Sequence, residues 1–579
     1  MSGICGIIRF DGKKVKEEEI QKMLDAMQNR GNDTEGIWID ENIGFGHKML
    51  WTTPESLYDN QPKVSQDGDL IITADARIDN REELFEKLEI DENDFSVIPD
   101  TALILWSYEK WGEECPSYLL GDFAFAIFDK IKKKIFFAKD HIGMRPFYYY
   151  VDKHFFYFSS EILPIFSIPS IKKLRNDHSI ETFLENTTLG YEETFFKNIK
   201  RLSSAHKMIL YNNNIAFSRY WFPEKLKINK DISFEDASKR FKELLEEAVQ
   251  VRLRSAYPIG CELSGGLDSS SVLCLAANMN RGKDITPFSK RYGDLACDES
   301  YYSDLVAESL GMNIQTVRID ELDYNVKYSL DKYLKSFPDW PTYANFMGLL
   351  PMAEKIQKKN IRILLTGQGG DHIAEGNLFI LADYLKAFKF YKLYKELRYY
   401  QWSRKIIKNY VIKPILPKFI FIVKDFLTLG KRKKSVYPNN FYENENSNIG
   451  FSSFAFKKDV DSVIGPFTSF WADSNVYHNI EKFNIESRHP YFDVRLIEFC
   501  LSLPEEYKLK YGISKRILKE AMKGILPEPV RSRNDKAEFS VPVVMQLESE
   551  LNKKSGTMST NILKNSCILG IEKWKDQNF

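Results

Sequence analysis

Residues 1 to about 215 alternate apolar and polar positions in short runs that are separated by turn residues. Four of these runs have the pattern of half-buried strands: 42–47, 69–74, 122–128 and 155–159. Two further stretches, 17–29 and 101–111, space their apolar residues as a helix does. The pattern therefore predicts a strand-rich first domain with few helices.

From residue 258 onward the pattern changes to alternating strand and helix. Before this point, Ser233 is placed to cap the start of a helix that extends to about Arg254. The alternation then continues through these segments: 258–261, 271–277, 286–290, 301–310, 314–319, 348–357 and 361–365. Such alternation predicts a parallel sheet with crossover helices, in which ligands bind at the carboxyl ends of the strands.

Length and charge limit the possible function classes. A chain of 579 residues is too long for one core, so two to four domains are expected. We place the main boundary between 1–215 and 216–579. Lys and Arg total 81, as do Asp and Glu, so net charge gives no whole-protein argument for binding nucleic acid or an anionic membrane.

The cysteines and the N-terminus indicate a cytosolic protein. The seven cysteines are scattered, odd in number and free of CxxC spacing, which favours buried thiols over disulfides or a zinc site. Arg9, Asp11 and Lys13 interrupt any apolar stretch at the N-terminus, so we expect no signal peptide. The sequence also contains no uncharged apolar window of about 18 residues, the length a membrane span needs.

The most informative motif follows the apolar run 258–261. It consists of Glu262, Leu263, Ser264, Gly265, Gly266, Leu267, Asp268, Ser269 and Ser270. Glycines allow close approach of a ligand, and a helix N-terminus presents free N–H groups to an anion. The serines add hydroxyl donors, and the aspartate suits a hard cation such as Mg²⁺. Since the lysine of the Walker A loop is missing, the motif predicts a nucleotide-phosphate site of another type.

A second glycine turn ends the apolar segment 361–365. It reads Thr366, Gly367, Gln368, Gly369, Gly370, Asp371. If both turns lie at the carboxyl ends of strands, Asp268 and Asp371 face one site and share a magnesium ion. Ser289, near the end of the segment 286–290, is a further candidate for nucleotide binding.

Residues 378–445 differ in composition from their surroundings. They are basic and aromatic, and Lys431 to Lys434 form a charge run. Charge runs are usually solvated surface, so a helical insertion is the simpler interpretation; a surface for a peptide or protein partner is the alternative.

With both glycine turns in view, the chain resembles the asparagine synthetase family over nearly its whole length. The first domain matches the family's glutamine amidotransferase motifs at 1–4, 30–33, 46–47, 61–62 and 120–124, and the second matches its synthetase motifs at 486–493, 526–528 and 533–539. The resemblance implies an Ntn-type αββα sandwich followed by a doubly wound parallel α/β ATP-pyrophosphatase domain with helical additions.

The resemblance also implies site residues and cofactors, namely ATP and Mg²⁺. Members of this family form an acyl-adenylate from a carboxylate and ATP, and an amine then attacks it. The nucleotide would contact Leu263, Ser264, Gly265, Gly266, Asp268, Ser269, Ser289, Thr366 and Gly367, and the metal Asp268 and Asp371. Lys536 falls where the family keeps a lysine that stabilises the transition state, and Glu486 is a candidate for orienting the attacking amine. Lys536 as a surface residue and Glu486 as part of a structural ion pair with Arg488 are the alternatives.

Several positions depart from the family pattern. The glutaminases use a cysteine exposed by removal of the initiator methionine, whereas position 2 is Ser2; Cys5 lies inside the predicted first strand and has no free α-amine as its base. Arg77 stands where a carboxylate should meet the glutamine α-amino group, and Met49 where an arginine should bind glutamine. We therefore expect glutamine hydrolysis to be lost.

The second glycine turn departs as well. Asparagine synthetases usually have glutamates at the positions of Gln368 and His372, whereas the metal-type aspartate remains. This combination resembles the lasso peptide cyclases and, more distantly, the β-lactam synthetases, which use an internal amine in place of ammonia.

The favoured interpretation is an ATP-dependent lasso peptide macrolactam synthetase. It would adenylate an Asp or Glu side chain of a precursor peptide and join it to the peptide N-terminal amine, releasing AMP and pyrophosphate. Expected partners are the precursor peptide, a leader-peptide-binding protein and a cysteine protease of the same pathway, with no nucleic acid. The alternatives are an asparagine synthetase using ammonia or glutamine, and an inert peptide-binding scaffold.

Overall fold

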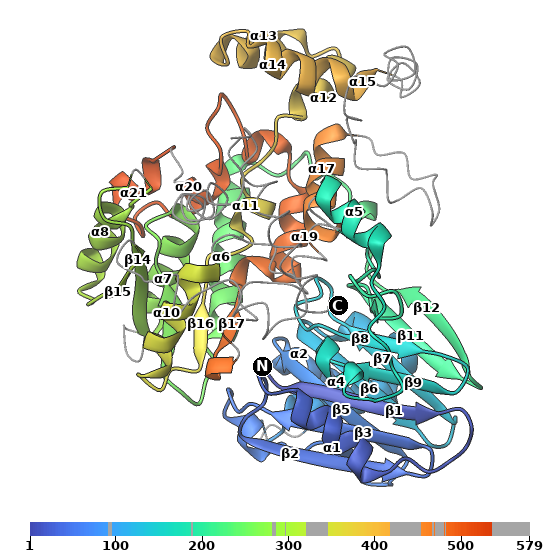
Figure 1. Ribbon diagram of the computed structural model, residues 1–579. Helices are drawn as coiled ribbons and strands as arrows, with labels where there is room; N and C mark the ends of the chain where they lie inside the picture. The colour runs from blue at the N-terminus through green and yellow to red at the C-terminus, as the bar shows by residue number, and fades with distance from the viewer. Residues whose placement is uncertain are drawn as a thin grey trace, which may run out of the picture.

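The computed structural model describes residues 1–579 except 91–94, 187–188, 281–284, 296, 320–345, 417–452, 466–467, 469–479, 481 and 535–579, and except the side chains of 184–186, 280 and 346–348. Two domains lie side by side (Figure 1). The first contains two antiparallel sheets, and the second is built on one parallel sheet.

Each sheet of the N-terminal domain has six strands. The first sheet has the order β10 (Lys200–Arg201), β8 (Tyr148–Val151), β9 (Phe155–Ser159), β1 (Gly3–Arg9), β3 (Ile43–Met49), β2 (Thr34–Asp40). The second has the order β12 (Asn214–Arg219), β11 (His206–Tyr211), β7 (Lys134–Lys139), β6 (Gly121–Asp129), β5 (Leu70–Ile78), β4 (Lys63–Val64). All four predicted strand runs lie in strands of these sheets.

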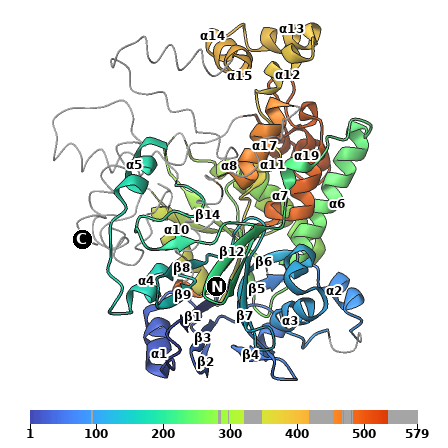
Figure 2. The ribbon, with the colours of Figure 1, turned by 90° about the vertical axis from the view of Figure 1, so that its right-hand side faces the viewer.

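Helices cover the outer faces of this sheet pair. On the first sheet lie α1 (Glu17–Ala26), α4 (Ile162–Phe166) and α5 (Asp177–Asn186), and on the second lie α2 (Arg81–Lys87) and α3 (Asp100–Trp111). Figure 2 shows α1 and α4 on one side of the sheets and α2 and α3 on the other. Between the sheets, Phe45, Phe137 and Phe158 belong to one apolar core. The four layers form the predicted αββα sandwich.

The sheet of the C-terminal domain is parallel throughout. Its order is β15 (Gln315–Arg318), β14 (Ile285–Arg291), β13 (Ile259–Glu262), β16 (Ile363–Leu365), β17 (Glu486–Arg488). The core on one face includes residues of α6 (Phe234–Arg252), α7 (Leu267–Asn280), α8 (Ser300–Leu310), α19 (Val494–Ser502) and α20 (Arg516–Ala521). The core on the other face includes α10 (Phe346–Gln357). Helices on both faces make this a doubly wound sheet, as predicted.

The helix start predicted at Ser233 is confirmed, and two other details differ from the prediction. Ser233 caps α6 by accepting a hydrogen bond from the Asp236 amide. The first difference is that α7 begins at Leu267 rather than near Ser271, so Asp268 lies in the first turn of the helix. β17 was not predicted, because its sequence, Glu-Ser-Arg, is polar although all three residues are buried.

The insertion forms a small helical module at one end of the molecule (Figure 1). It contains α12 (Ile380–Lys386), α13 (Phe390–Tyr399), α14 (Arg404–Ile406), the π-helix η5 (Ile407–Ile412) and α15 (Lys413–Ile415). Leu381, Leu397 and Val411 belong to its own apolar core. The charge run Lys431 to Lys434 lies outside the described residues.

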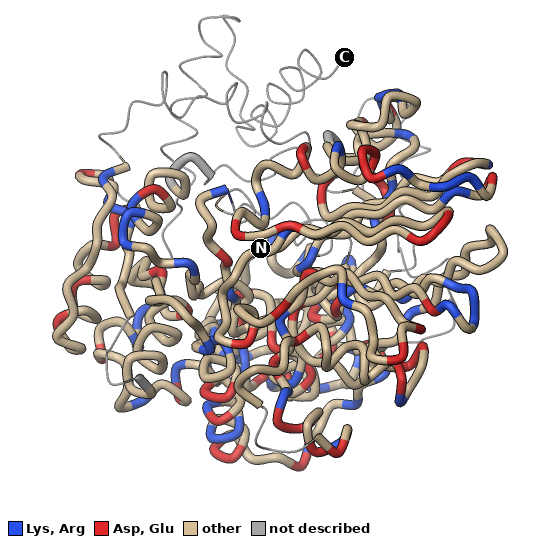
Figure 3. Tube along the Cα trace, turned by 90° about the horizontal axis from the view of Figure 1, so that it is seen from below, with Lys and Arg blue, Asp and Glu red and all other residues tan. Residues whose placement is uncertain are grey.

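Ion pairs and hydrogen bonds join the two domains. Arg362 pairs with Asp33 at 2.6 Å, and the Asn32 side-chain amide donates to Asn484 Oδ1 at 2.7 Å. In Figure 3 basic and acidic residues are interspersed over both domains as seen from below. All six described cysteines are buried, in agreement with the prediction of buried thiols. Within the described part of the chain, no helix is both long and apolar enough to cross a membrane.

Candidate active site

The two glycine turns follow neighbouring strands of the parallel sheet. From β13 the chain moves outward to β14 and β15, and it then returns to place β16 on the other side of β13. The strand order therefore reverses between β13 and β16, and in open α/β sheets ligands bind at the carboxyl ends of the strands at such a point. The sequence predicted that the two turns share one edge of the sheet, and the structure brings them together there.

Hydrogen bonds among its own serines hold the first turn. The Ser264 and Ser269 hydroxyls lie 2.9 Å apart, the Ser269 hydroxyl accepts from the Ser264 amide at 3.1 Å, and the Gly266 amide donates to Ser264 Oγ at 3.2 Å. Gly265 has a φ of +88°, and a Cβ on it would lie 2.8 Å from the Glu299 carbonyl. Only glycine fits this conformation and spacing without strain.

The second turn packs directly on the first. A Cβ added to Gly367 would lie 2.5 Å from the Ser269 amide nitrogen, and one on Gly370 would lie 2.4 Å from Asp268 Oδ1. Thr366 Oγ1 is 2.6 Å from His489 Nδ1, which follows β17. The glycines therefore allow the backbone of one turn to contact the aspartate of the other.

A lysine that the sequence did not single out joins the two aspartates. The Lys515 ammonium contacts Asp268 Oδ2 and lies 2.6 Å from Asp371 Oδ1. Burial by itself lowers the pKa of Lys515, but the two carboxylates outweigh burial and raise the pKa above its usual value. No local motif marks this lysine, because Lys508, Lys510 and Lys519 surround it in the sequence.

Two carboxylates that converge on one ammonium group are close enough to share a metal ion. Mg²⁺ in nucleotide sites is typically held by one or two carboxylates together with substrate phosphates. The donor set of Asp268 and Asp371 fits that requirement. The assignment of Mg²⁺ to these residues remains a prediction.

Arg533 reaches the first turn from the C-terminal end of the described chain. Its guanidinium donates to the Gly265 carbonyl at 3.2 Å, pairs with Glu299 at 2.5 Å and lies 3.9 Å from the centre of the Tyr302 ring. Lys536, the predicted transition-state lysine, lies outside the described residues.

The remaining nucleotide candidates lie on or next to the strands. Leu263 is fully buried, and its amide donates to the Phe288 carbonyl at 2.8 Å. Ser289 is buried on β14, one residue beyond Phe288, which pairs with Glu262 at the end of β13. A direct contact of Ser289 with the nucleotide remains a prediction.

Glu486 lies in different surroundings from the two aspartates. It begins β17, opposite Ile363, whereas the glycine turn follows the other end of β16. Its carboxylate lies 2.6 Å from Arg488 and 3.0 Å from Arg145 of the N-terminal domain. Burial raises the pKa of Glu486, but the surrounding arginines outweigh burial and hold the pKa well below its usual range. These contacts favour the structural interpretation of Glu486 over an amine-orienting role.

In the N-terminal domain, the structure brings Ser2 and Met49 together, two of the positions that differ from the glutaminase pattern. Ser2 Oγ accepts a hydrogen bond from the Leu50 amide at 3.0 Å and lies 3.5 Å from Met49 Sδ. Sequence comparison placed Met49 at the position of a glutamine-binding arginine, and the structure places its uncharged thioether against the Ser2 hydroxyl. Cys5 is fully buried in β1, where burial raises the pKa of its thiol.

Arg77 requires a correction to its predicted effect. It was expected to present a positive charge to the α-amino group of glutamine. Its guanidinium instead lies 2.9 Å from both Asp79 and Asp122 and 3.8 Å from Glu486. The charge of Arg77 is therefore compensated in the domain interface. Relative to the glutaminase pattern, what remains at position 77 is the loss of a carboxylate.

Comparison with known proteins agrees with these two halves. Residues 1–221 match the glutamine amidotransferase domain family, and residues 240–417 and 480–558 match the asparagine synthase family. A Methanocaldococcus jannaschii protein assigned to the glutamine-hydrolysing asparagine synthetases is 32% identical over 406 residues, covering 66% of this chain and 77% of the relative. The chain belongs to the asparagine synthetase family.

Other relatives align over most of the chain. Asparagine synthetase (glutamine-hydrolysing) 3 of Bacillus subtilis is 26% identical over 564 residues, covering 92% of this chain and 86% of the relative. Amidase chry2 of Gibberella zeae is 24% identical over 637 residues, covering 98% and 91%. As an asparagine synthetase family member, this protein is an ATP-dependent amide-forming ligase.

The geometry at Ser2 predicts that this family member does not hydrolyse glutamine. Purified protein is expected to release no glutamate from glutamine, with or without ATP, because a hydroxyl is a weaker nucleophile than a thiolate and Met49 offers no charge to the substrate. Ser2→Ala should leave ATP-dependent amide formation unchanged. A glutamate dehydrogenase-coupled assay for glutamate and an AMP-release assay on the same samples measure both effects.

Two further results bear on this prediction. Ser2→Cys should also fail to produce glutamate, because the thiol would still lie against Met49. Glutamate release by the unsubstituted protein that disappears in Ser2→Ala would contradict the prediction and restore a glutamine-dependent reaction.

Proposed function

We propose that this protein is an ATP-dependent macrolactam synthetase of the lasso peptide cyclase type. It activates an Asp or Glu side chain of a precursor peptide as the acyl-adenylate, with release of pyrophosphate. The N-terminal amine of the same peptide then attacks the acyl carbon, the C–O bond to AMP breaks, and the amine loses a proton as the amide forms.

The observation that carries this proposal is the contrast between the two halves. In the synthetase half, Asp268 and Asp371 are brought together beside the first glycine turn. In the N-terminal half, the Ser2 hydroxyl lies against Met49. A ligase that has kept its ATP-dependent half and lacks a source of ammonia needs an amine that is already part of its substrate.

The second glycine turn supports the same conclusion. His372 stands where asparagine synthetases usually have a glutamate, and its Nδ1 lies 2.9 Å from the Ser462 carbonyl of α17 (Phe454–Ile464). Its ring also packs against Phe492, with 5.7 Å between the centroids. An imidazole held by a neighbouring helix does not supply the carboxylate that recognition of free aspartate or ammonia would use.

The described residues divide the work at the site in a simple way. The glycine turn with Ser264 and Ser269 is suited to hold the phosphates through N–H and hydroxyl donors. Bound Mg²⁺, with Asp268 and Asp371 as its protein ligands, would supply positive charge to the phosphates. Lys515 adds a fixed positive charge beside the two aspartates. This charge would stabilise the negative charge that develops on the departing pyrophosphate. Ring closure also gains from holding both ends of one peptide together.

A second candidate function has support from the relatives. Several are named asparagine synthetases, and ammonia-dependent or glutamine-dependent formation of asparagine from aspartate fits those names. An inert peptide-binding scaffold is less consistent with the chain, because Asp268, Asp371 and Lys515 keep a charged cluster that a scaffold has no reason to retain.

Product analysis distinguishes the two enzymatic functions. The probe is a set of synthetic peptides with a free N-terminal amine and one internal Asp or Glu at varied positions, incubated with ATP and Mg²⁺. We expect AMP and pyrophosphate in equal amounts, and one peptide that loses a single water by mass spectrometry. Matched peptides with an acetylated N-terminus, or with Asn or Gln in place of the acid, should stay linear.

The outcome that contradicts the proposal is equally specific. Ammonium chloride with free aspartate should support no AMP release; asparagine formation under these conditions would favour the second candidate. The expected partners, a leader-peptide-binding protein and a cysteine protease, would be added to the same assay with the full-length precursor. Release of ADP and phosphate would contradict both functions.

A further inference from the structure

The helical module at one end of the molecule carries a concentrated positive charge. Residues 378–416 contain nine Lys and Arg but only two Asp and Glu, a net of seven positive charges in a chain whose net charge is zero. The basic residues are Lys386, Lys389, Lys392, Lys395, Arg398, Arg404, Lys405, Lys408 and Lys413. The zero net charge of the whole chain therefore hides a strong local imbalance.

Both acidic residues of the module face the rest of the protein. Asp383 accepts hydrogen bonds from Ser453 Oγ at 2.7 Å and from the Phe454 amide at 2.7 Å. Glu396 is buried and accepts from the Tyr511 amide at 2.9 Å. Lys392 also turns toward this side and pairs with Glu506 at 2.6 Å. The acids therefore compensate none of the charge on the outer side.

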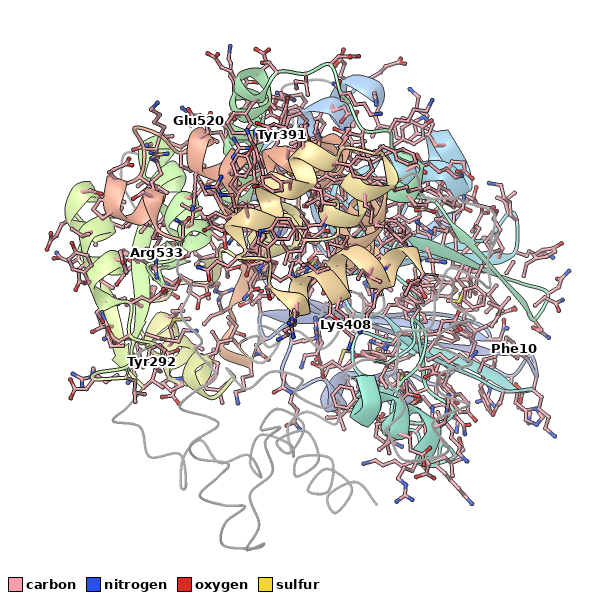
Figure 4. All side chains as sticks on the ribbon, turned by 90° about the horizontal axis from the view of Figure 1, so that it is seen from above. Phe10, Tyr292, Tyr391, Lys408, Glu520 and Arg533 are labelled. Carbon is pink, nitrogen blue, oxygen red and sulfur yellow. The ribbon has the colours of Figure 1, made fainter. Side chains whose placement is uncertain are left out.

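The outer side consists of cations and aromatic rings. Seven exposed cations make no ion pair with any residue that the structure describes: Lys386, Lys389, Lys395, Arg398, Arg404, Lys405 and Lys408. Six aromatic side chains are exposed between them: Phe388, Phe390, Tyr391, Tyr394, Tyr399 and Trp402. We refer to these thirteen side chains as the tip surface. Figure 4 looks onto the module from above and labels Tyr391 and Lys408, which both belong to it.

The exposure of these rings is unusual for this protein. Phe388 is 78% exposed, Tyr391 is 69% exposed and Phe390 is 58% exposed. Thirteen aromatic residues among those described are exposed, and six of them lie within the fifteen residues 388–402. Large exposed apolar groups that gather in one place mark interaction sites.

The tip surface is part of a folded unit and projects away from both domains (Figures 1 and 2). The module has its own apolar core, which includes Leu393 and Leu397 of α13. Tyr399, a ring of the tip surface that is 55% exposed, also packs on its other side against Gly512, where a Cβ would lie 1.9 Å from the ring. The rings and cations are therefore presented on a fixed scaffold.

We propose that the tip surface binds the surface of an anionic lipid membrane. Aromatic rings with an apolar body are favoured at the level of lipid headgroups, and lysines are attracted by the negative surface potential of anionic lipids. Lys395 lies 4.5 Å from the centre of the Tyr391 ring, so cations and rings alternate within one patch. A surface that projects from the body suits a flat partner better than an extended acidic peptide, which would need a groove.

This attachment would be peripheral and independent of the proposed function. It places the ligase at the membrane through the helical module. The glycine turns lie outside this module, at the edge of the parallel sheet. The interaction rests on charge together with partly inserted rings, so it should weaken as salt screens the cations.

Vesicle sedimentation tests the proposal with the full chain. The probes are vesicles of phosphatidylcholine alone and vesicles of phosphatidylcholine and phosphatidylglycerol in equal parts. We expect sedimentation with the anionic vesicles and little with the neutral ones. Lys389→Glu with Lys395→Glu should weaken binding by at least about ten-fold, given the contribution of each cation near an anionic surface.

Matched variants keep the result interpretable. Lys230→Glu with Lys239→Glu changes the net charge equally at exposed positions outside the module and should bind as the unsubstituted protein does. Phe388→Ser with Tyr391→Ser leaves the charge intact and should also weaken binding, while ATP-dependent amide formation and the unfolding temperature stay unchanged in every variant.

Three results would overturn the proposal. The first is equal binding to neutral and anionic vesicles, and the second is equal loss in the tip variants and the matched control. The third is an absence of sedimentation together with binding of a poly-glutamate peptide that the tip variants abolish, which would identify an acidic polypeptide as the partner.

Discussion

Asp268→Asn and Asp371→Asn are each expected to lower kcat by about 100-fold or more, the range seen when one group that stabilises developing charge is removed. The two carboxylates converge on the Lys515 ammonium next to the glycine turns. An asparagine side chain keeps the size but loses the charge, and neutral amides bind Mg²⁺ poorly. AMP release at saturating ATP and substrate measures the effect.

The same variants separate a catalytic role from a structural one. The Asp371 side chain is 37% exposed, so its replacement should change the unfolding temperature little. Asp231→Asn, at an exposed position before α6, serves as the control and should retain full activity. Near-normal kcat in either site variant, or a loss of activity that parallels unfolding, would show that the two aspartates do not form a shared catalytic site.

The sequence was sufficient to predict the sheet edge at which these aspartates lie. Both glycine turns follow apolar runs, and apolar runs that alternate with helical stretches indicate a parallel sheet. Because strands of a parallel sheet have their carboxyl ends at one edge, the sequence alone places Asp268 and Asp371 together. Their actual contact depends on Gly367 and Gly370, whose missing Cβ atoms let the turns touch.

Lys515 could not be found in the same way. Lys515 is the residue just before α20, and its own backbone is left-handed, with a φ of +53°. This conformation lets its side chain reach the two aspartates. Arg533 likewise reaches Gly265 only through the packing of the C-terminal segment. Both contacts join residues that are distant in the sequence. Arg533 begins the stretch 533–539 that resembles a family motif, but neither residue type nor spacing marks the contacts themselves in advance.

The interpretation of Glu486 and Arg77 shows a different limit of sequence reasoning. A buried strand that reads Glu-Ser-Arg contradicts the usual apolar composition of a parallel strand. It is stable here because the N-terminal domain supplies Arg145 to the glutamate, while Arg488 also donates to the carbonyls of Arg252 and Arg254 at 2.8 and 2.6 Å. Arg488 is on the strand itself, but Arg145 and Arg77 belong to the other domain, so the strand pattern alone could not reveal those two partners.

This network predicts that Glu486→Gln destabilises the protein strongly. Arg145, Arg488 and Arg77 all lie within 4 Å of the Glu486 carboxylate, and each is fully buried. Removing the one carboxylate leaves these buried positive charges with less compensation. Breaking a buried ion pair by removing one partner typically costs about 3–5 kcal/mol. Thermal unfolding should therefore show a clearly lower midpoint than that of the unsubstituted protein.

Kinetics on the folded fraction then decide between the two roles of Glu486. If the residue is structural, kcat per folded molecule stays near normal, and Glu486→Gln combined with Arg145→Gln recovers part of the lost stability because a buried charge is removed with its partner. Glu83→Gln, in an exposed pair with Lys87, should change stability by no more than about 0.5 kcal/mol. An unchanged unfolding midpoint with a collapse of kcat would instead assign Glu486 to the reaction, as the position that orients or deprotonates the attacking amine.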